Sequence, residues 1–300
     1  KDGMADDLNA LQEQTGIPFV HIDCYTGSMG DTYRTLGTLL GKETEMYEQL
    51  YMGTIDMALE TIAFQSTTHP ELTIEDLPYM FATREDGYKA LDGGYGDKIN
   101  EIIASDGQIR NLGFMELGYR HMTNNVRPIN TPDDMKGIKF RTTTSDLRLA
   151  VFEALGAQPV SMSFSEVFTG LQQNVINGQE NPPTLIYASG FQEVQKYLTL
   201  HKHVHNFLSV LTNENWLNSL SADDQQLVKD CVAEMVTTQR SMELEDNDAV
   251  VAKLQDAGME VNELTDEQYQ AFVDAVQPMY DEYKQQWGTE IFDLATSYNK

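Results

Sequence analysis

The stretch from Gly137 to Pro183 constrains the fold more than any other part of the sequence. Its hydrophobic periodicity switches repeatedly between that of a strand and that of a helix, which is typical of α/β proteins. The predicted elements are, in chain order, a strand at 138–141, a helix at 145–155, a short strand at 160–162, a helix from Ser163 and a short strand before Pro182. Ser163 and Glu166 have the spacing of a capping box at the start of the second helix.

Two polar residues stand at strand ends of this stretch. Arg141 ends the first strand, and Asn181 ends the last one. Polar residues just beyond strand ends are the usual ligand-contacting positions in α/β segments. A planar guanidinium matches the two oxygens of a carboxylate. We therefore expect Arg141 to bind an acid, with Asn181 close to it.

The chain carries a formal net charge of −27. Such a surface repels nucleic acid and anionic lipid, so neither is an expected partner. Five of the eight arginines nevertheless lie between residues 110 and 148, which favours local binding of a small anion. The alternative is that each arginine pairs with a surface acid. This alternative is favoured for every arginine except Arg141, whose position at a strand end is specific.

Length and composition indicate a globular protein. The 300 residues are enough for one large domain or two ordinary ones, and 41% of them are hydrophobic. No run approaches the 18 consecutive apolar residues of a transmembrane helix. The chain begins with Lys-Asp-Gly rather than Met, so we expect a processed or trimmed chain from which any signal peptide has been removed.

The two cysteines, Cys24 and Cys231, lie far apart in the sequence and form no CxxC motif. They allow at most one disulfide, and the spacing does not decide whether it forms. Two buried thiols are the favoured expectation, because free cysteine is commonly buried.

Three histidines occupy alternate positions in the run His201-Lys-His203-Val-His205. On a strand they would share one face, as metal ligands can. No acid or cysteine is adjacent in the sequence. We therefore expect the three histidines to lie on the polar face of a strand and to bind no metal.

The rest of the chain continues the alternation of helices and strands. A helical pattern without Gly or Pro runs from Ser221 past Leu254 and predicts a helix of more than 30 residues that crosses more than one domain. Thr265 and Gln268 form another capping-box pattern. Further predicted helices are 4–14, 43–52, 84–91, 95–105 and 280–298, and further strands are 19–25, 54–59, 109–117 and 207–211, with a Gly-rich loop at 26–41.

Glu60 follows directly after the predicted strand at 54–59. Two interpretations of Glu60 are equally favoured: it accepts hydrogen bonds from ligand hydroxyls, or it is an ordinary loop acid. The sequence contains no GxSxG, HExxH or GxGxxG motif. A binding protein is therefore favoured over an enzyme.

From Arg141 onward the sequence resembles the TRAP-transporter solute-binding proteins, the DctP-type receptors of tripartite ATP-independent periplasmic transporters. The resemblance is carried by Gly-Ile-Lys-Phe-Arg at 137–141 and by the run from Gly156 to Pro182, which ends in Asn-Gly-Gln-Glu-Asn-Pro. It extends to the segments 39–58, 69–81 and 120–141, and covers most of residues 36 to 240.

This resemblance implies an α/β fold of two domains, with a ligand cleft between them and a long domain-spanning helix. We expect one domain from 1–117 with 207–246, and the other from 118–206 with 247–300. The implied function is that of a monomeric extracytoplasmic receptor, free in a periplasm or lipid-anchored. It would bind an organic acid, such as a sugar acid or a C4-dicarboxylate, without catalysis, cofactor or metal, and deliver it to the membrane permease subunits.

The resemblance also assigns roles to single residues. Arg141 matches the arginine that clamps the ligand carboxylate, and Asn181 the asparagine beside it. Arg120 matches a second, less uniform arginine, Phe164 an aromatic residue that packs on the ligand, and Glu60 a polar position that reads hydroxyl groups. A glutamate beside two arginines favours a hydroxylated acid.

The chain departs from the family pattern before its first helix. The strand that normally opens the family is absent, and residues 25–41 form a longer segment than expected. We therefore expect part of the pocket wall to lie outside this sequence. Two alternatives remain open: a ligand-sensing domain, or an enzyme acting on a carboxylated small molecule with Arg141 as anchor and Glu60 or a histidine as base.

Overall fold

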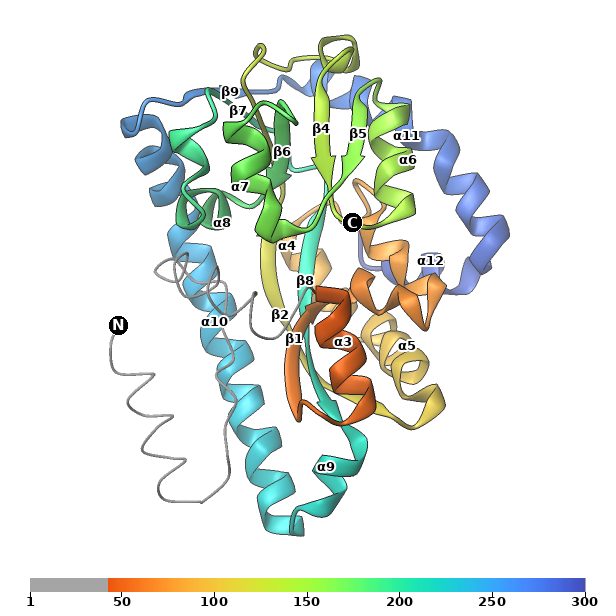
Figure 1. Ribbon diagram of the computed structural model, residues 1–300. Helices are drawn as coiled ribbons and strands as arrows, with labels where there is room; N and C mark the ends of the chain where they lie inside the picture. Colours follow the sequence, from red (N-terminus) through yellow and green to blue (C-terminus); the bar gives the residue numbers. More distant parts are fainter. Residues whose placement is uncertain (1–42, 300) are drawn as a thin grey trace.

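A computed structural model describes residues 43–299 of the chain, apart from the side chains of residues 67 and 244–248. The predicted helix at 4–14, the strand at 19–25, the loop at 26–41 and Cys24 lie outside the described residues. Two sheets form the framework, one above the other in Figure 1, with a mixture of helices around them.

The smaller sheet has the strand order β1-β8-β2, and both pairings are antiparallel. Its strands are β1 (Met57–Thr61), β2 (Ile109–Tyr119) and β8 (His205–Asn213). Every residue of β8 is buried, because β8 is the central strand and is covered on both faces. Phe114 belongs to the core cluster that includes residues of α5 (Gly94–Ile103), whereas its neighbour Met115 packs with α10.

The larger sheet has six strands in the order β5-β4-β6-β3-β7-β9. Its strands are β3 (His121–Asn124), β4 (Lys139–Thr142), β5 (Gln158–Ser161), β6 (Gly178–Asn181), β7 (Tyr197–Leu200) and β9 (Glu260–Glu263). Strand β4 pairs in parallel with β5 and β6, as the alternating strand and helix pattern requires. Strand β3 is antiparallel to both of its neighbours.

Helix α10 (Ala222–Asp256) is the predicted long helix, and its 35 residues correspond to about 52 Å. It packs against β2 of the small sheet and against α8 (Pro183–Ala188), which follows β6 of the large sheet. Figure 1 shows it running along both parts of the molecule. Gly113 permits its close approach, because a Cβ at this position would lie 3.0 Å from Val236 Cγ2.

The C-terminal region differs from the prediction. Helix α11 (Asp266–Trp287) runs through Pro278, where the sequence pattern predicted a break before a final helix at 280–298. Pro278 is exposed, so water can satisfy the carbonyl that proline leaves without a helical hydrogen bond. The break occurs instead at Gly288, whose φ of 83° separates α11 from α12 (Thr289–Thr296). The capping box at Thr265 and Gln268 is confirmed.

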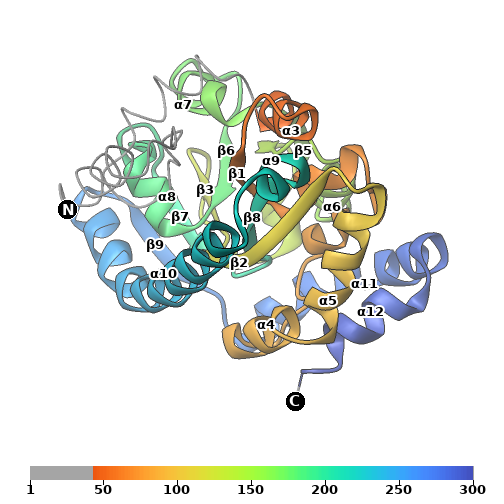
Figure 2. The ribbon, with the colours of Figure 1, turned by 90° about the horizontal axis from the view of Figure 1, so that it is seen from below.

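The remaining helices surround the two sheets. They are α3 (Glu43–Met52), α4 (Arg84–Leu91), α6 (Asp146–Ala154), α7 (Phe164–Gln172) and α9 (Glu214–Ser219), with short 3-10 helices η1 (Ile62–Thr67), η2 (Pro70–Asp76), η3 (Ala104–Asp106), η4 (Pro132–Met135) and η5 (Phe191–Glu193). Seen from below, α10 and α3 stand around the small sheet, with α4, α5 and α12 at another side (Figure 2).

Three local predictions are wrong. Ser163 does not cap α7 through its side chain, because its hydroxyl hydrogen-bonds the Glu166 carboxylate instead of the backbone. Cys231 is an exposed free thiol on α10, not a buried one. Residues 201–204 are not a strand, and the histidines are buried rather than displayed on a polar face.

The predicted division into two domains stays a prediction. Helix α12, which falls in the predicted second domain, packs against α4 and α5, which fall in the first. Phe272 and Phe292 join the same core cluster as Tyr95 and Ile99. Within residues 43–299, no helix combines the length and the apolar character that crossing a membrane requires.

Candidate functional site

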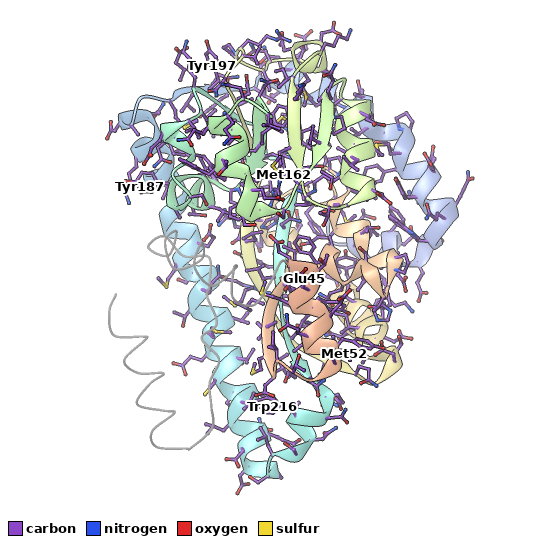
Figure 3. The ribbon with its side chains drawn as sticks, viewed as in Figure 1. Glu45, Met52, Met162, Tyr187, Tyr197 and Trp216 are labelled. Carbon is purple, nitrogen blue, oxygen red and sulfur yellow. The ribbon has the colours of Figure 1, made fainter. Side chains whose placement is uncertain are left out.

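A cavity lies between the two sheets and has a volume of about 740 Å³, including the part open to solvent. This size lies within the usual range of small-molecule sites. Its wall combines residues of β1 and η1 from the small-sheet side with residues of β4, α6, α7 and β6 from the large-sheet side. Met162, whose carbonyl lies beside this cavity through its contact with Arg141, is near the middle of the molecule in Figure 3.

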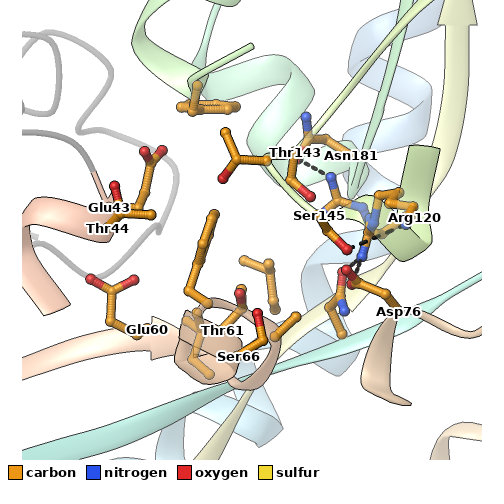
Figure 4. Close-up of a pocket in the computed structure, with 18 of the residues that line it drawn as sticks. Glu43, Thr44, Glu60, Thr61, Ser66, Asp76, Arg120, Thr143, Ser145 and Asn181 are labelled. Carbon is orange, nitrogen blue, oxygen red and sulfur yellow. Dashed lines mark hydrogen bonds and ion pairs between the residues drawn. The ribbon is translucent and has the colours of Figure 1, made fainter. Parts of the chain in front are cut away.

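All five residues predicted to bind a ligand line this one cavity. They come from five separate segments of the chain and are Glu60, Arg120, Arg141, Phe164 and Asn181. In Figure 4, Arg120 and Asn181 lie on one side of the cavity and Glu60 on the other. Their contribution to binding stays a prediction.

Arg141 lies in β4 and is 2% exposed. Its Nε donates a hydrogen bond to the Met162 carbonyl at 2.8 Å, and its guanidinium lies 5.8 Å from the ring centre of Phe164. Burial lowers the pKa of Arg141 to about 10, so the group remains a cation at neutral pH. Among the side chains that the structure describes, no carboxylate lies within 4.0 Å of it, and no described group accepts a hydrogen bond from its two terminal nitrogens. Arg141 is therefore a buried cation. The hydrogen bond from its Nε orients the guanidinium, and the two terminal nitrogens of the guanidinium are available to a ligand.

Arg120 differs from Arg141 because it is already paired. It lies between β2 and β3 and is 3% exposed. Its Nε and Nη2 contact the carboxylate of Glu180, and Nη2 also donates to Asn181 Oδ1 at 2.8 Å. Asn181 in turn donates from Nδ2 to Gln179 Oε1 at 2.5 Å. Arg120 and Asn181 thus reach the cavity as members of a fixed network.

Glu180 is the centre of that network and is fully buried in β6. Arg148 Nη1 donates to both of its carboxylate oxygens at 3.1 Å, and the ring of His203 hydrogen-bonds it at 3.1 Å. Burial by itself raises the pKa of Glu180, but the positive charges of Arg120 and Arg148 outweigh it and hold this pKa well below its ordinary value. Glu180 therefore stays ionised and neutralises part of the arginine excess.

Arg148 extends the network toward the small sheet. Its Nη2 forms an ion pair with Asp76, the last residue of η2, and also donates to Asn206 Oδ1 at 3.3 Å. Although burial lowers the pKa of Arg148, the charges of Asp76 and Glu180 raise it above its ordinary value. Two arginines and two carboxylates thus form ion pairs with one another, whereas Arg141 feels the charge of Glu180 but forms no ion pair with a described side chain.

The opposite side of the cavity is acidic. Glu60 of β1 is 3% exposed, and Glu43, the first residue of α3, is 8% exposed. Burial, together with the negative charge of Glu43, raises the pKa of Glu60 well above its ordinary value. Thr44, Thr61 and Ser66 add hydroxyl groups to this part of the lining (Figure 4).

Gly178 allows strand β6, which carries Asn181, to pack beside strand β4, which carries Arg141. A Cβ at this position would lie 2.5 Å from the Thr123 carbonyl and 3.1 Å from Phe140 Cε2. Only glycine therefore permits β6 to pack between β3 and β4 at this point. This packing sets Glu180 and Asn181 beside the strand that carries Arg141.

The three histidines of the 201–205 run do not form a metal site. His203 contacts Glu180, and the ring of His205 hydrogen-bonds Glu116 Oε1 at 2.7 Å. In the part of the chain that the structure describes, no cluster of three or more His, Cys, Asp or Glu side chains could hold a metal ion.

Sequence reasoning missed Asp76, Arg148, Glu180 and His203 as parts of the site. Each of these residues lies at least 23 positions in the sequence from its hydrogen-bond partner, so no local pattern reveals the pairing. The arginine excess and the Gln-Glu-Asn run were the available signals, because a buried glutamate needs cationic partners.

Comparisons with known proteins agree with this geometry. The family described as bacterial extracellular solute-binding protein, family 7 (DctP), matches residues 37–286. The chain belongs to this family. As a DctP-family protein it is 34% identical over 237 residues to the 2,3-diketo-L-gulonate-binding periplasmic protein YiaO of Escherichia coli, over 79% of this chain and 71% of the relative.

Two solved structures place the fold of this DctP-family protein among periplasmic solute-binding proteins of two domains. One is the sugar acid binding protein DctPAm of Advenella mimigardefordensis in complex with galactonate, with a TM-score of 0.83, 30% identity and coverage of 87% of this chain and 85% of that one. The other is a TRAP periplasmic solute binding protein of Shewanella oneidensis with bound succinate, with a TM-score of 0.84, 26% identity and coverage of 93% and 97%. The predicted family, fold class and receptor function are confirmed.

Proposed function

We propose that this DctP-family receptor binds an organic acid through one carboxylate, held by the guanidinium of Arg141. The observation that carries the proposal is the state of this side chain. Arg141 is buried and oriented by the Met162 carbonyl, and its terminal nitrogens have no hydrogen-bond partner among the described groups. A carboxylate is the group that this planar fork matches best, and exclusion of water strengthens the pair.

The opposite side of the cavity favours a hydroxylated acid. Glu60 can accept hydrogen bonds from ligand hydroxyls, and Thr44, Thr61 and Ser66 can both donate and accept. The galactonate complex of the Advenella protein supports a sugar acid as the ligand class. Phe164, next to Arg141, would cover the carbon chain of the ligand.

The receptor would act as a monomer outside the cytoplasm, free or lipid-anchored, and deliver its ligand to the TRAP membrane permease subunits. The two domains, 1–117 with 207–246 and 118–206 with 247–300, would close over the ligand. It would bind without catalysis, since no nucleophile and base line the cavity in a catalytic arrangement among the described residues.

A thermal-shift screen against a library of organic acids tests this proposal. A ligand at a hundredfold excess over its Kd stabilises the folded state by about 2.7 kcal/mol. We expect hydroxylated monocarboxylic acids to give the largest shifts. Mass spectrometry of each hit after incubation should return the acid unchanged. Chemical conversion of a bound acid, or no response to any carboxylate, would contradict the proposed function.

A further inference from the structure

Glu60 has an unusual position for a buried carboxylate. Its Oε1 is buried and accepts no hydrogen bond from any residue that the structure describes. None of the cations of residues 43–299 lies within 4.0 Å of it, whereas Glu180 in the same region contacts two arginines and a histidine. A buried polar atom without a partner is costly, so Glu60 is suited to a ligand that donates hydrogen bonds.

A second acid reinforces this character. Glu43 lines the same side of the cavity, and Figure 4 shows Glu43, Thr44 and Glu60 together, across from Arg120, Asn181 and Asp76. Burial raises the pKa of Glu60, and the negative charge of Glu43 raises it further. A group that occupies this side of the cavity therefore meets the negative charge of Glu43 and, at a pH that ionises it, that of Glu60, so that the negative field is strongest at alkaline pH.

The charge of Arg141 acts on Glu43 across the cavity, whereas the other described cations of the cavity are engaged elsewhere. Three described arginines line the cavity, and two of them, Arg120 and Arg148, are bound by Glu180 and Asp76. Arg141 is left for the ligand, and one guanidinium fork matches one carboxylate.

We propose that Glu60, with Glu43 beside it, makes the receptor selective for monocarboxylic acids and excludes acids that carry a second carboxylate at their far end. The inference rests on the proposed function, because it assumes that Arg141 holds the first carboxylate. A terminal hydroxyl donates a hydrogen bond to Glu60. At alkaline pH, where Glu60 is ionised, a carboxylate at the same place has no proton to donate and meets like charge, which is how binding sites reject a wrong ligand.

Galactonate and galactarate provide a matched pair of probes. Both are six-carbon sugar acids with the same internal hydroxyls, and they differ in one end, which is an alcohol in galactonate and a carboxylate in galactarate. Gluconate and glucarate form a second pair. Calorimetry at pH 8.5 measures the four dissociation constants for the wild-type protein and for Glu60→Gln, and for the double variant Glu43→Gln/Glu60→Gln.

We expect the wild-type protein to bind the better monocarboxylate at least a hundredfold more tightly than its dicarboxylate partner. Glu60→Gln should reduce this ratio at least tenfold, and the double variant should reduce it further, chiefly because the dicarboxylate binds more tightly. A control with the same change of net charge is Glu85→Gln/Glu101→Gln, which alters two exposed acids on α4 and α5 and should leave the ratio unchanged.

The outcomes separate the two claims. Equal affinity of the wild-type protein for both members of a pair overturns the charge selection, as does a folded Glu60→Gln variant that binds the monocarboxylate but gains nothing for the dicarboxylate. In both cases the proposed function stands if Arg141→Ala still abolishes binding of the monocarboxylate. Failure of the wild-type protein to bind any of the four acids counts against both claims.

Discussion

Three arginines in one cavity have different roles because their surroundings differ. Arg120 and Arg148 each face a buried carboxylate at hydrogen-bonding distance, so they act as structural charges. Arg141 donates from Nε to a carbonyl and has an aromatic ring beside it, but it forms no ion pair with a described carboxylate. The distinction between a ligand-binding and a structural arginine therefore depends on the partners each one finds in the fold.

This distinction was only partly accessible from the sequence. The strand-end position marked Arg141, and the resemblance added Arg120, Asn181, Phe164 and Glu60, all of which line the cavity. The sequence does not predict the pairing of Arg120 with Glu180, because the two residues are 60 positions apart. It depends on β3 and β6 pairing in an antiparallel register, with His121 opposite Asn181.

Replacement of Arg148 should destabilise the protein strongly. Arg148→Ala leaves Asp76 and Glu180 with less compensation in a buried environment, and breaking such a network costs about 3–5 kcal/mol. Urea unfolding measures the loss. Arg110→Ala is the matched control, because Arg110 is 41% exposed in its pair with Glu214 and such pairs contribute about 0–1 kcal/mol. Similar losses for both variants would contradict the structural role of Arg148.

At the scale of elements, periodicity predicted well where one stripe or face is buried. The long helix, the strands around Arg141 and the helix opened by Thr265 appear as expected. Errors occurred where tertiary surroundings override a local signal. Pro278 does not break α11, and residues 201–204 lie outside the strands, with His201 against the Tyr79 hydroxyl and His203 against the buried Glu180 of a distant segment.

Gln239 fastens α10 to the central framework. Its Oε1 accepts from Glu116 N at 2.9 Å, and its Nε2 donates to Glu116 O at 2.7 Å, so one amide satisfies both polar groups of a β2 residue. Gln239→Ala should lower the free energy of unfolding by about 1–3 kcal/mol, because two buried backbone groups lose their partners. Gln226→Ala, on the exposed part of the same helix, should change it by less than about 0.5 kcal/mol. Equal losses of unfolding free energy for the two variants in chemical denaturation would contradict the role of Gln239 in holding α10 against β2.

At the scale of the whole molecule, buried neutral histidines should make the fold sensitive to acid. Burial lowers the pKa of His121 to about 3, while an exposed histidine titrates near 6.5. Below pH 6.5 the unfolded chain therefore takes up a proton that the folded state does not. Stability is lost as the pH falls from about 6.5 toward 3, by up to about 1.4 kcal/mol per pH unit for this residue.

The variant His121→Gln isolates this contribution. Its free energy of unfolding should decline less steeply below pH 6.5 than that of the wild-type protein, whatever its absolute stability. His69→Gln, at a half-buried position outside the network, serves as the control. Parallel pH profiles for His121→Gln and the wild-type protein would show that His121 does not contribute to acid sensitivity.

The whole molecule thus holds two sheets around a cavity in which Arg141, the arginine without an ion pair to a described side chain, faces an acidic wall. Whether Arg141 holds the ligand is tested by calorimetry of the tightest organic acid from the thermal-shift screen, on the wild-type protein, Arg141→Ala and Arg110→Ala. We predict that Arg141→Ala weakens binding by about 2–5 kcal/mol, on the order of 30-fold or more, and that Arg110→Ala leaves it unchanged. An unchanged dissociation constant for a folded Arg141→Ala variant would contradict the account.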